Sequence, residues 1–160
     1  MTKKILLLSG DPNSINSEII YKSWKKLVPS LKKQLYLIGN FKLLKAQFKK
    51  LGYPLKMIKV NSIKEKTKTN HLKIINIDIE FNKPFDVPQK KRSKFILKSL
   101  NLAHRLAEKK LVLGIINCAI DKKLLGKKNS GVTEYLASKC KVKNHSEVML
   151  IRNKNLSVIP

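Results

Sequence analysis

Short apolar runs alternate with segments of helical spacing in the first sixty residues. Ile5 to Leu8 is an apolar run ended by Gly10 and Pro12, which is typical of a buried strand leading into a turn. The next segment predicts a helix that stops near Pro29, with Ile20, Trp24, Leu27 and Val28 on its apolar face. Strands are expected at 35–38 and 57–60, and between them a helix ended by Gly52, with Phe41, Leu44, Phe48 and Leu51 on its apolar face.

The second half continues the pattern after a polar, Lys-rich loop at 61–70. A strand is predicted at 74–79, and 81–91 crosses the surface, because two prolines exclude regular helix or central strand there. Ser93 is expected to cap a long helix whose inward positions are Ile96, Leu100, Ala103 and Ala107. The remaining elements are the most apolar strand of the chain, at 111–116, a helix at 133–138, and two strands at 147–151 and 156–160.

This order of elements predicts the α/β class. Strands that are apolar throughout and alternate with helices indicate a mostly parallel sheet with helices on both faces. The chain stops inside its last apolar run, and a natural domain rarely ends there. We therefore expect residues 1–160 to be the amino-terminal portion of a longer polypeptide.

The charge has two interpretations. Lys supplies 32 of the 35 basic residues, and the formal net charge is +25. Lys is spread along the whole chain and Arg is rare, which favours a compositional bias that uses Lys wherever a helix face meets water. The alternative is a basic, non-enzymatic module that binds nucleic acid or another polyanion. A binder requires one continuous basic face, whereas compositional bias leaves Lys on every solvated face.

Several classes of protein are excluded. Cys118 and Cys140 have no disulfide-scaffold or zinc spacing, and His71, His104 and His145 share no ligand-like spacing, so a metal site from this chain alone is not expected. No apolar run approaches the ~18 residues of a membrane span, and none suits a signal peptide. We expect a cytoplasmic protein with no membrane partner.

Candidate chemistry lies in the loops after the first strand and after 111–116, because ligands of open α/β sheets bind at the carboxyl ends of strands. The backbone N–H groups of the first loop, 9–14, could hold an anion, or the loop could be an ordinary turn. Neither dinucleotide nor P-loop glycine fingerprints occur. In the second loop, the Thr133 hydroxyl could bind a phosphate or carboxylate, or simply cap its helix.

Two segments together resemble one family. Residues 7–19, LLSGDPNSINSEI, resemble the opening Gly-Asp/Glu-Pro-x-x-Ile-x-x-Glu of the 4-hydroxythreonine-4-phosphate dehydrogenases of vitamin B6 biosynthesis, and 115–137 resemble the family's strand, Pro-x-x-Lys turn and Gly-His-Thr-Glu loop. The order and spacing agree over all 160 residues. The matching residues are Gly10, Asp11, Pro12, Ile15, Glu18, Lys122, Gly131, Thr133 and Glu134.

The resemblance implies the first part of a two-domain, isocitrate-dehydrogenase-like architecture, with the second domain absent from these residues. Such enzymes are homodimers that use NAD or NADP and a divalent metal (Zn, Mg or Co) to oxidise a phosphorylated amino acid, 4-phosphooxy-threonine. The family's three metal-ligand His lie beyond the position of Pro160, so the resemblance implies no metal ligand and no catalytic residue here. The substrate-binding loop is implied at Val132, Thr133 and Glu134.

The sequence departs from the family pattern at several positions. Val132 stands where the family has its substrate-contacting His, and Ala119 stands for the proline of the Pro-x-x-Lys turn. Ser14 and Asn16-Ser17 replace small residues of the opening loop. Because a valine side chain cannot hydrogen-bond a phosphate or carboxylate, Val132 is expected to weaken or alter substrate recognition.

Overall fold

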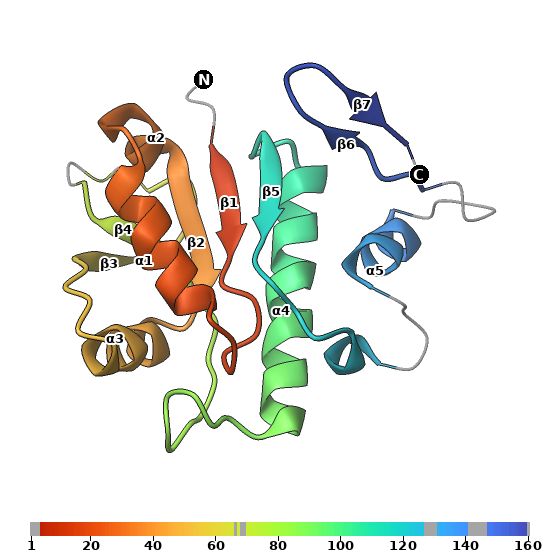
Figure 1. The fold of residues 1–160 in the computed structure, drawn as a ribbon. Coiled ribbons are helices and arrows are strands. Elements are labelled where there is room, and N and C mark those ends of the chain that lie inside the picture. The colour runs from red at the N-terminus through yellow and green to blue at the C-terminus, as the bar shows by residue number, and fades with distance from the viewer. Residues whose placement is uncertain (1–3, 66, 68–69, 127–130, 141–146, 160) are drawn as a thin grey trace.

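The computed structural model describes residues 4–65, 67, 70–126, 131–140 and 147–159, and its main body is one parallel sheet (Figure 1). The strand order is β3-β4-β2-β1-β5, and every neighbouring pair is parallel. The strands are β1 (Ile5–Leu8), β2 (Leu35–Gly39), β3 (Met57–Val60), β4 (Leu72–Asn76) and β5 (Gly114–Asn117). The predicted α/β class with a parallel sheet is confirmed.

Helices cover both faces of the sheet, as predicted. The helices α1 (Asn16–Lys26) and α3 (Phe41–Lys50) pack on the face that carries Leu35 and Leu37, with Trp24 and Phe48 in the shared core. The long helix α4 (Gln89–Glu108) packs on the opposite face. Side chains of a strand alternate between faces, so β1, β2 and β4 supply both cores, and β2, in which every residue is buried, is the most enclosed strand of the sheet.

The strand predicted to be the most apolar lies at the sheet's edge. β5 begins at Gly114 rather than at 111, and it pairs with β1 on one side only among the described strands. Its side chains are therefore poorly covered, and Ile116 is 51% exposed. Apolar composition alone does not distinguish a central strand from an edge strand.

Three helix predictions require correction. α4 begins at Gln89 with Pro88 as its N-cap residue, and Ser93 is not a cap, because its hydroxyl donates to the Leu124 carbonyl oxygen at 2.6 Å. The prolines of 81–91 thus precede the helix instead of excluding it, since proline is tolerated at a helix start. A short helix, α2 (Pro29–Gln34), also begins at the proline expected only to stop α1.

The two short helical elements after β5 pack against α4. A 3-10 turn, η1 (Lys122–Leu125), buries Leu124 and Leu125, and α5 (Val132–Lys139) buries Tyr135 and Ala137. The two strands expected near the end are present but short: β6 (Ile151–Arg152) and β7 (Ser157–Val158) form an exposed antiparallel ribbon. The expected strand at 74–79 likewise lies earlier, at β4. Residues 127–130, His145 and Pro160 lie outside the described residues.

Candidate functional site

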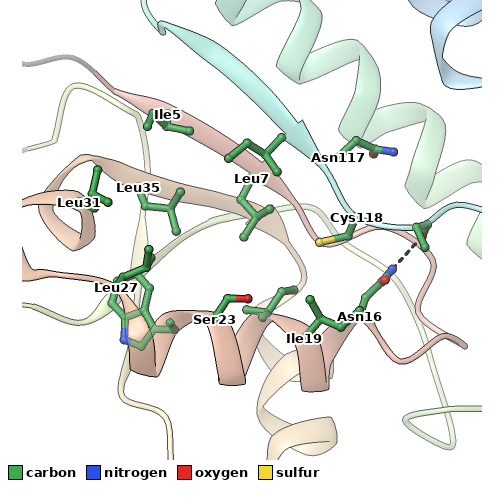
Figure 2. A pocket seen from close by; sticks show the side chains of 14 residues that line it. Ile5, Leu7, Asn16, Ile19, Ser23, Leu27, Leu31, Leu35, Asn117 and Cys118 are labelled. Carbon is green, nitrogen blue, oxygen red and sulfur yellow. Dashed lines mark hydrogen bonds between the residues drawn. The ribbon is translucent and has the colours of Figure 1, made fainter. Parts of the chain in front are cut away.

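The loops that follow β1 and β5 meet at the carboxyl edge of the sheet. The backbone N–H of Asp11 donates to the Ala119 carbonyl oxygen at 3.0 Å, and Cys118 N–H donates to Leu8 at 3.2 Å. The Asn16 side-chain amide donates to the same Ala119 oxygen at 2.8 Å (Figure 2). The two segments that resemble the dehydrogenase family are therefore in direct contact, as an open α/β sheet requires of neighbouring strands.

Gly10 makes this contact between the loops sterically feasible. Its φ is +69°, which favours glycine. A β-carbon at this position would lie 2.4 Å from Asn16 Nδ2 and 2.5 Å from the Ala119 oxygen. The close approach of the two loops therefore explains why the opening motif has glycine at position 10.

Asp11 is buried and paired with Arg92 of α4. Arg92 Nη1 lies 3.0 Å from Asp11 Oδ1 and 2.8 Å from Oδ2, and Oδ1 also accepts the backbone N–H of Asn13. The pair joins the opening loop to the first turn of α4. Asp11 is therefore a structural ion-pair partner in this chain, and neither oxygen is turned toward open solvent.

Two further polar side chains fix the same loop, the buried Gln47 and the exposed Asn13. Gln47 of α3 donates to the carbonyl oxygens of Pro12 and Pro84, at 2.8 and 2.7 Å. Asn13 exchanges two hydrogen bonds with the backbone of Val87. The space enclosed beneath the loop is about 10 Å³, which is about enough for one water molecule and leaves no room for a phosphate group. The geometry favours the ordinary-turn interpretation over an anion site.

Glu18 and Lys122 of the motif lie on the surface. Glu18 accepts a hydrogen bond from Lys22 at 2.6 Å, and this bond and the nearby positive charge lower the pKa of the Glu18 carboxyl. Lys122 is exposed in η1, where Asp121 caps the turn by accepting the Lys123 N–H at 3.0 Å.

The Gly131–Glu134 segment begins α5. Gly131 is the N-cap residue and Thr133 is the second residue of the helix, so the interpretation of Thr133 as a plain N-cap is wrong. The Thr133 side chain is exposed, whereas the Glu134 carboxylate folds back over Gly131, within 2.9 Å of where a β-carbon would lie. An acidic side chain in the first turn stabilises the helix N-terminus. Thr133 is thus free to meet a ligand from solvent.

Val132 is partly buried and packs against the core between α4 and the sheet. An apolar side chain here is used for packing, and it offers no donor to a ligand. Figure 1 shows α5 beyond α4, away from α1 and α3. Among the described residues, α4 contacts both parts: Arg92 pairs with Asp11, and Ser93 donates to the Leu124 carbonyl oxygen of η1, the element before α5.

An apolar groove of about 480 Å³ lies between α1 and the β1–β5 side of the sheet (Figure 2). Its walls include Leu7, Ile19, Leu31 and Ile116, and only a few polar side chains reach it. Burial raises the pKa of the Cys118 thiol in this groove to about 11, so it stays protonated near neutrality. Such a lining does not suit a doubly charged phosphate, but it suits contact with other protein.

The described residues do not form a metal site. No group of three or more His, Cys, Asp or Glu side chains among them could hold a metal ion. Both cysteines are free. In the part of the chain that the structure describes, no helix is long and apolar enough to cross a membrane.

Exposed Lys side chains occur on both sides of the sheet. On one side, α1 and α3 carry Lys22, Lys25, Lys26, Lys42, Lys45, Lys49 and Lys50, and on the other, α4 carries Lys90, Lys91, Lys94 and Lys98. This distribution is the one that compositional bias predicts. It does not favour a single polyanion-binding face.

The open parallel sheet, the helices on both faces and the motif-bearing loops at its carboxyl edge define an α/β protein of the open-sheet class. Within that class the chain belongs to the PdxA family of pyridoxal phosphate biosynthetic proteins, whose family model matches residues 31–160. A curated relative, the 4-hydroxythreonine-4-phosphate dehydrogenase of Erythrobacter litoralis, is 27% identical over 156 residues. That match covers 94% of this chain and 46% of the relative.

Solved structures agree on the fold. A 4-hydroxythreonine-4-phosphate dehydrogenase from Burkholderia phymatum superposes with a TM-score of 0.82 at 21% identity, covering 99% of this chain and 49% of that one. The enzyme of that name from Klebsiella pneumoniae gives 0.83 at 21% identity, covering 98% and 50%. The chain thus spans about half the length of the relatives it matches.

Proposed function

We propose that this chain is the amino-terminal α/β portion of a 4-hydroxythreonine-4-phosphate dehydrogenase and supplies part of its substrate-binding surface. The observation that carries the proposal is the family match over residues 31–160, together with the relative that aligns over 94% of the chain. The family resemblance adds the substrate, 4-phosphooxy-threonine, and assigns its binding to the loop at Thr133 and Glu134.

The described geometry supports a binding role at Thr133. Its hydroxyl is exposed in the first turn of α5, where free backbone N–H groups and the helix dipole favour an anionic ligand group. We propose that Thr133 donates a hydrogen bond to the substrate and that Glu134 holds the first turn in shape by lying over Gly131. Val132 leaves the substrate without the partner that the family's His provides.

NAD or NADP would accept the hydride, and a divalent metal would polarise the substrate's hydroxyl oxygen. The described residues do not fit either group, because they form no metal-ligand cluster and the opening loop encloses no room for a pyrophosphate. We propose that both groups bind the half of the family's length that this chain does not span. The chain alone is then inactive.

The apolar groove also supports a complete enzyme divided between this chain and the half of the family's length that it does not span. Ile19 and Ile116 are 44% and 51% exposed on its walls, and β5 is an edge strand. We propose that the other half of the family's length forms a second domain that also covers this groove, and that the complete enzyme is a cytoplasmic homodimer. Burying these side chains would stabilise the packing of the second domain on this chain by roughly 25 cal/mol per Å² of apolar surface removed from water.

The proposal is tested by assaying two proteins for metal-dependent NADH formation from 4-phosphooxy-threonine. One is the purified chain, which should be inactive. The other is the chain fused to the carboxyl-terminal half of the Erythrobacter litoralis relative, which should be active. Turnover by the chain alone would refute the proposal that the metal and the cofactor bind outside this chain. A folded fusion that binds cofactor but never oxidises this substrate would refute the proposed substrate.

A further inference from the structure

The helices α4 and α5 place three reactive side chains in a row, outside the loops described above. Cys140 Sγ lies 3.4 Å from His104 Nε2, and His104 Nδ1 lies 3.3 Å from Glu108 Oε2. His104 and Glu108 are one turn apart on α4, and Cys140 is the C-cap residue of α5. The order thiol, imidazole, carboxylate is that of an activated nucleophile.

The contacts favour one tautomer of the His104 ring. The Glu108 carboxylate lies 3.3 Å from Nδ1 and has no hydrogen to offer, so it favours the tautomer with the hydrogen on Nδ1. Nε2 then has its lone pair toward Cys140 and can accept the thiol proton. The same arrangement excludes a shared metal ion, because the sulfur and the carboxylate contact opposite nitrogens of the ring.

The packing of α5 on α4 holds Cys140 next to His104. The Tyr135 hydroxyl donates to Asn101 Oδ1 at 2.9 Å, one turn from His104, and Tyr135 is buried. The His104 side chain is only 11% exposed, whereas Cys140 is exposed at the end of its helix. The base is thus held in place while the thiol remains open to reagents.

A basic hollow adjoins the cluster. It has a volume of about 680 Å³, and His104 lines it together with Lys98, Arg105 and Lys139. Three positive side chains around one hollow raise the local concentration of small anions. A reagent that reaches Cys140 through this hollow is therefore favoured if it is negatively charged.

We propose that Cys140 is a reactive thiol, with His104 as its base and Glu108 as the group that orients the imidazole, and that it forms mixed disulfides with small anionic disulfides. The Cys140 thiol proton passes to His104 Nε2, and the thiolate attacks one sulfur of the disulfide. The new S–S bond forms as the old one breaks, so Cys140 is oxidised and the departing sulfur is reduced. The departing thiolate takes the proton from His104.

Cys118 provides an internal reference. It is half-buried in the apolar groove, and burial raises its pKa to about 11. Its thiolate fraction near neutrality is small, so it should react slowly. This site is independent of the proposed dehydrogenase function, because it uses none of the residues assigned to substrate binding.

The test measures reaction of the folded Cys118→Ser variant with 5,5′-dithiobis(2-nitrobenzoate), an anionic disulfide, followed by the absorbance of the released thiolate. Cys140 should react at least about tenfold faster than in the same chain unfolded by urea. His104→Gln should abolish that advantage, since general-base assistance contributes roughly 10²- to 10⁴-fold. His71→Gln is the matched control. Equal rates in the folded and unfolded chains, or an unchanged His104→Gln rate, would overturn the proposal.

Glu108 and the hollow have separate tests. Glu108→Ala should slow the reaction of the folded chain without changing Tm or the rate of the urea-unfolded chain, because the imidazole loses the carboxylate that orients it. Lys98, Arg105 and Lys139, which line the same hollow, remain. Lys139→Gln should slow the anionic reagent severalfold and leave neutral dipyridyl disulfide unchanged. An unchanged rate for the folded Glu108→Ala chain would refute the role of Glu108, and equal slowing of both reagents by Lys139→Gln would refute the anion preference.

Discussion

Arg92 of α4 donates hydrogen bonds from one nitrogen, Nη1, to both carboxylate oxygens of Asp11, at 3.0 and 2.8 Å. The side chains are 18% and 7% exposed, so the pair is nearly removed from water. Two segments 81 residues apart are thus joined at the opening loop. The conformation of this loop depends on a contact that no local pattern contains.

Replacing one partner of this pair should destabilise the chain strongly. Asp11→Ala leaves the Arg92 guanidinium buried without its partner, and breaking a buried pair typically costs about 3 to 5 kcal/mol. Lys91→Gln is the control, because it breaks the exposed pair with Glu80, and such pairs contribute about 0 to 1 kcal/mol. Urea unfolding of both variants measures the difference. Equal losses would show that the Asp11 pair has no special structural role.

Two glycines with nearly the same positive φ should respond differently to replacement by alanine. Gly52 has φ +68° and nothing near its β-carbon position, so Gly52→Ala should lower the free energy of unfolding by about 1 to 2 kcal/mol from the left-handed conformation alone. Gly10 has φ +69° and two polar atoms within 2.5 Å of that position, so Gly10→Ala should lose about 1 to 3 kcal/mol more. Chemical denaturation of the two variants provides the comparison. Similar losses would contradict the close approach of the two loops.

Lys73 should make stability depend on pH. Its side chain is buried in β4, where Nζ donates to the carbonyl oxygens of Lys32 and Lys33 at 3.1 and 2.7 Å. Burial, and to a smaller extent Lys4, lowers the pKa of Lys73 below its ordinary 10.5. As the pH rises from the folded-state pKa to 10.5, the unfolded chain holds more protons, so stability rises with pH.

The measurement is urea unfolding of the wild type and of Lys73→Met between neutral pH and pH ~10.5. The wild type should gain stability relative to Lys73→Met through that window and show a constant difference below it. Lys45→Met, on the exposed side of α3, controls for the loss of one positive charge. A relative gain toward low pH would mean that the charged form of Lys73 is the favoured one in the fold.

Affinity for DNA should be weak and sensitive to salt. Among the described residues, exposed Lys side chains lie on helices of both faces of the sheet, as expected of a general attraction to phosphate rather than of one dedicated binding surface. Attraction to phosphate alone falls steeply with salt, so binding should weaken by at least about tenfold between ~50 and ~200 mM salt, with no sequence preference. Titrations of several duplexes at both salt concentrations test this. A tight complex with one preferred sequence at the higher salt would favour the polyanion-binding alternative.

The sequence predicted the sheet well because its strands are set by local apolar runs. β1 to β3 lie within a residue of their expected ranges. Ser93 was misassigned because a hydroxyl can serve a helix cap or a distant carbonyl, and only packing selects the Leu124 oxygen. Cys140 and His104 have no sequence signal of their own, since they meet only where α5 crosses α4.

The Thr133 loop provides the sharpest test of substrate binding, in the fusion with the carboxyl-terminal half of the Erythrobacter litoralis relative. Thr133 is exposed and is not the cap of α5, so Thr133→Ala should change the free energy of unfolding by less than about 0.5 kcal/mol. If its hydroxyl donates to the substrate, KM should rise by roughly ten- to a hundredfold, the equivalent of ~1.5 to 3 kcal/mol for a bond to a charged group. Val132→His should lower KM by supplying a donor, at some loss of stability because Val132 packs against the core. A Thr133→Ala enzyme with unchanged KM would remove this loop from the substrate site, whatever its effect on the fold.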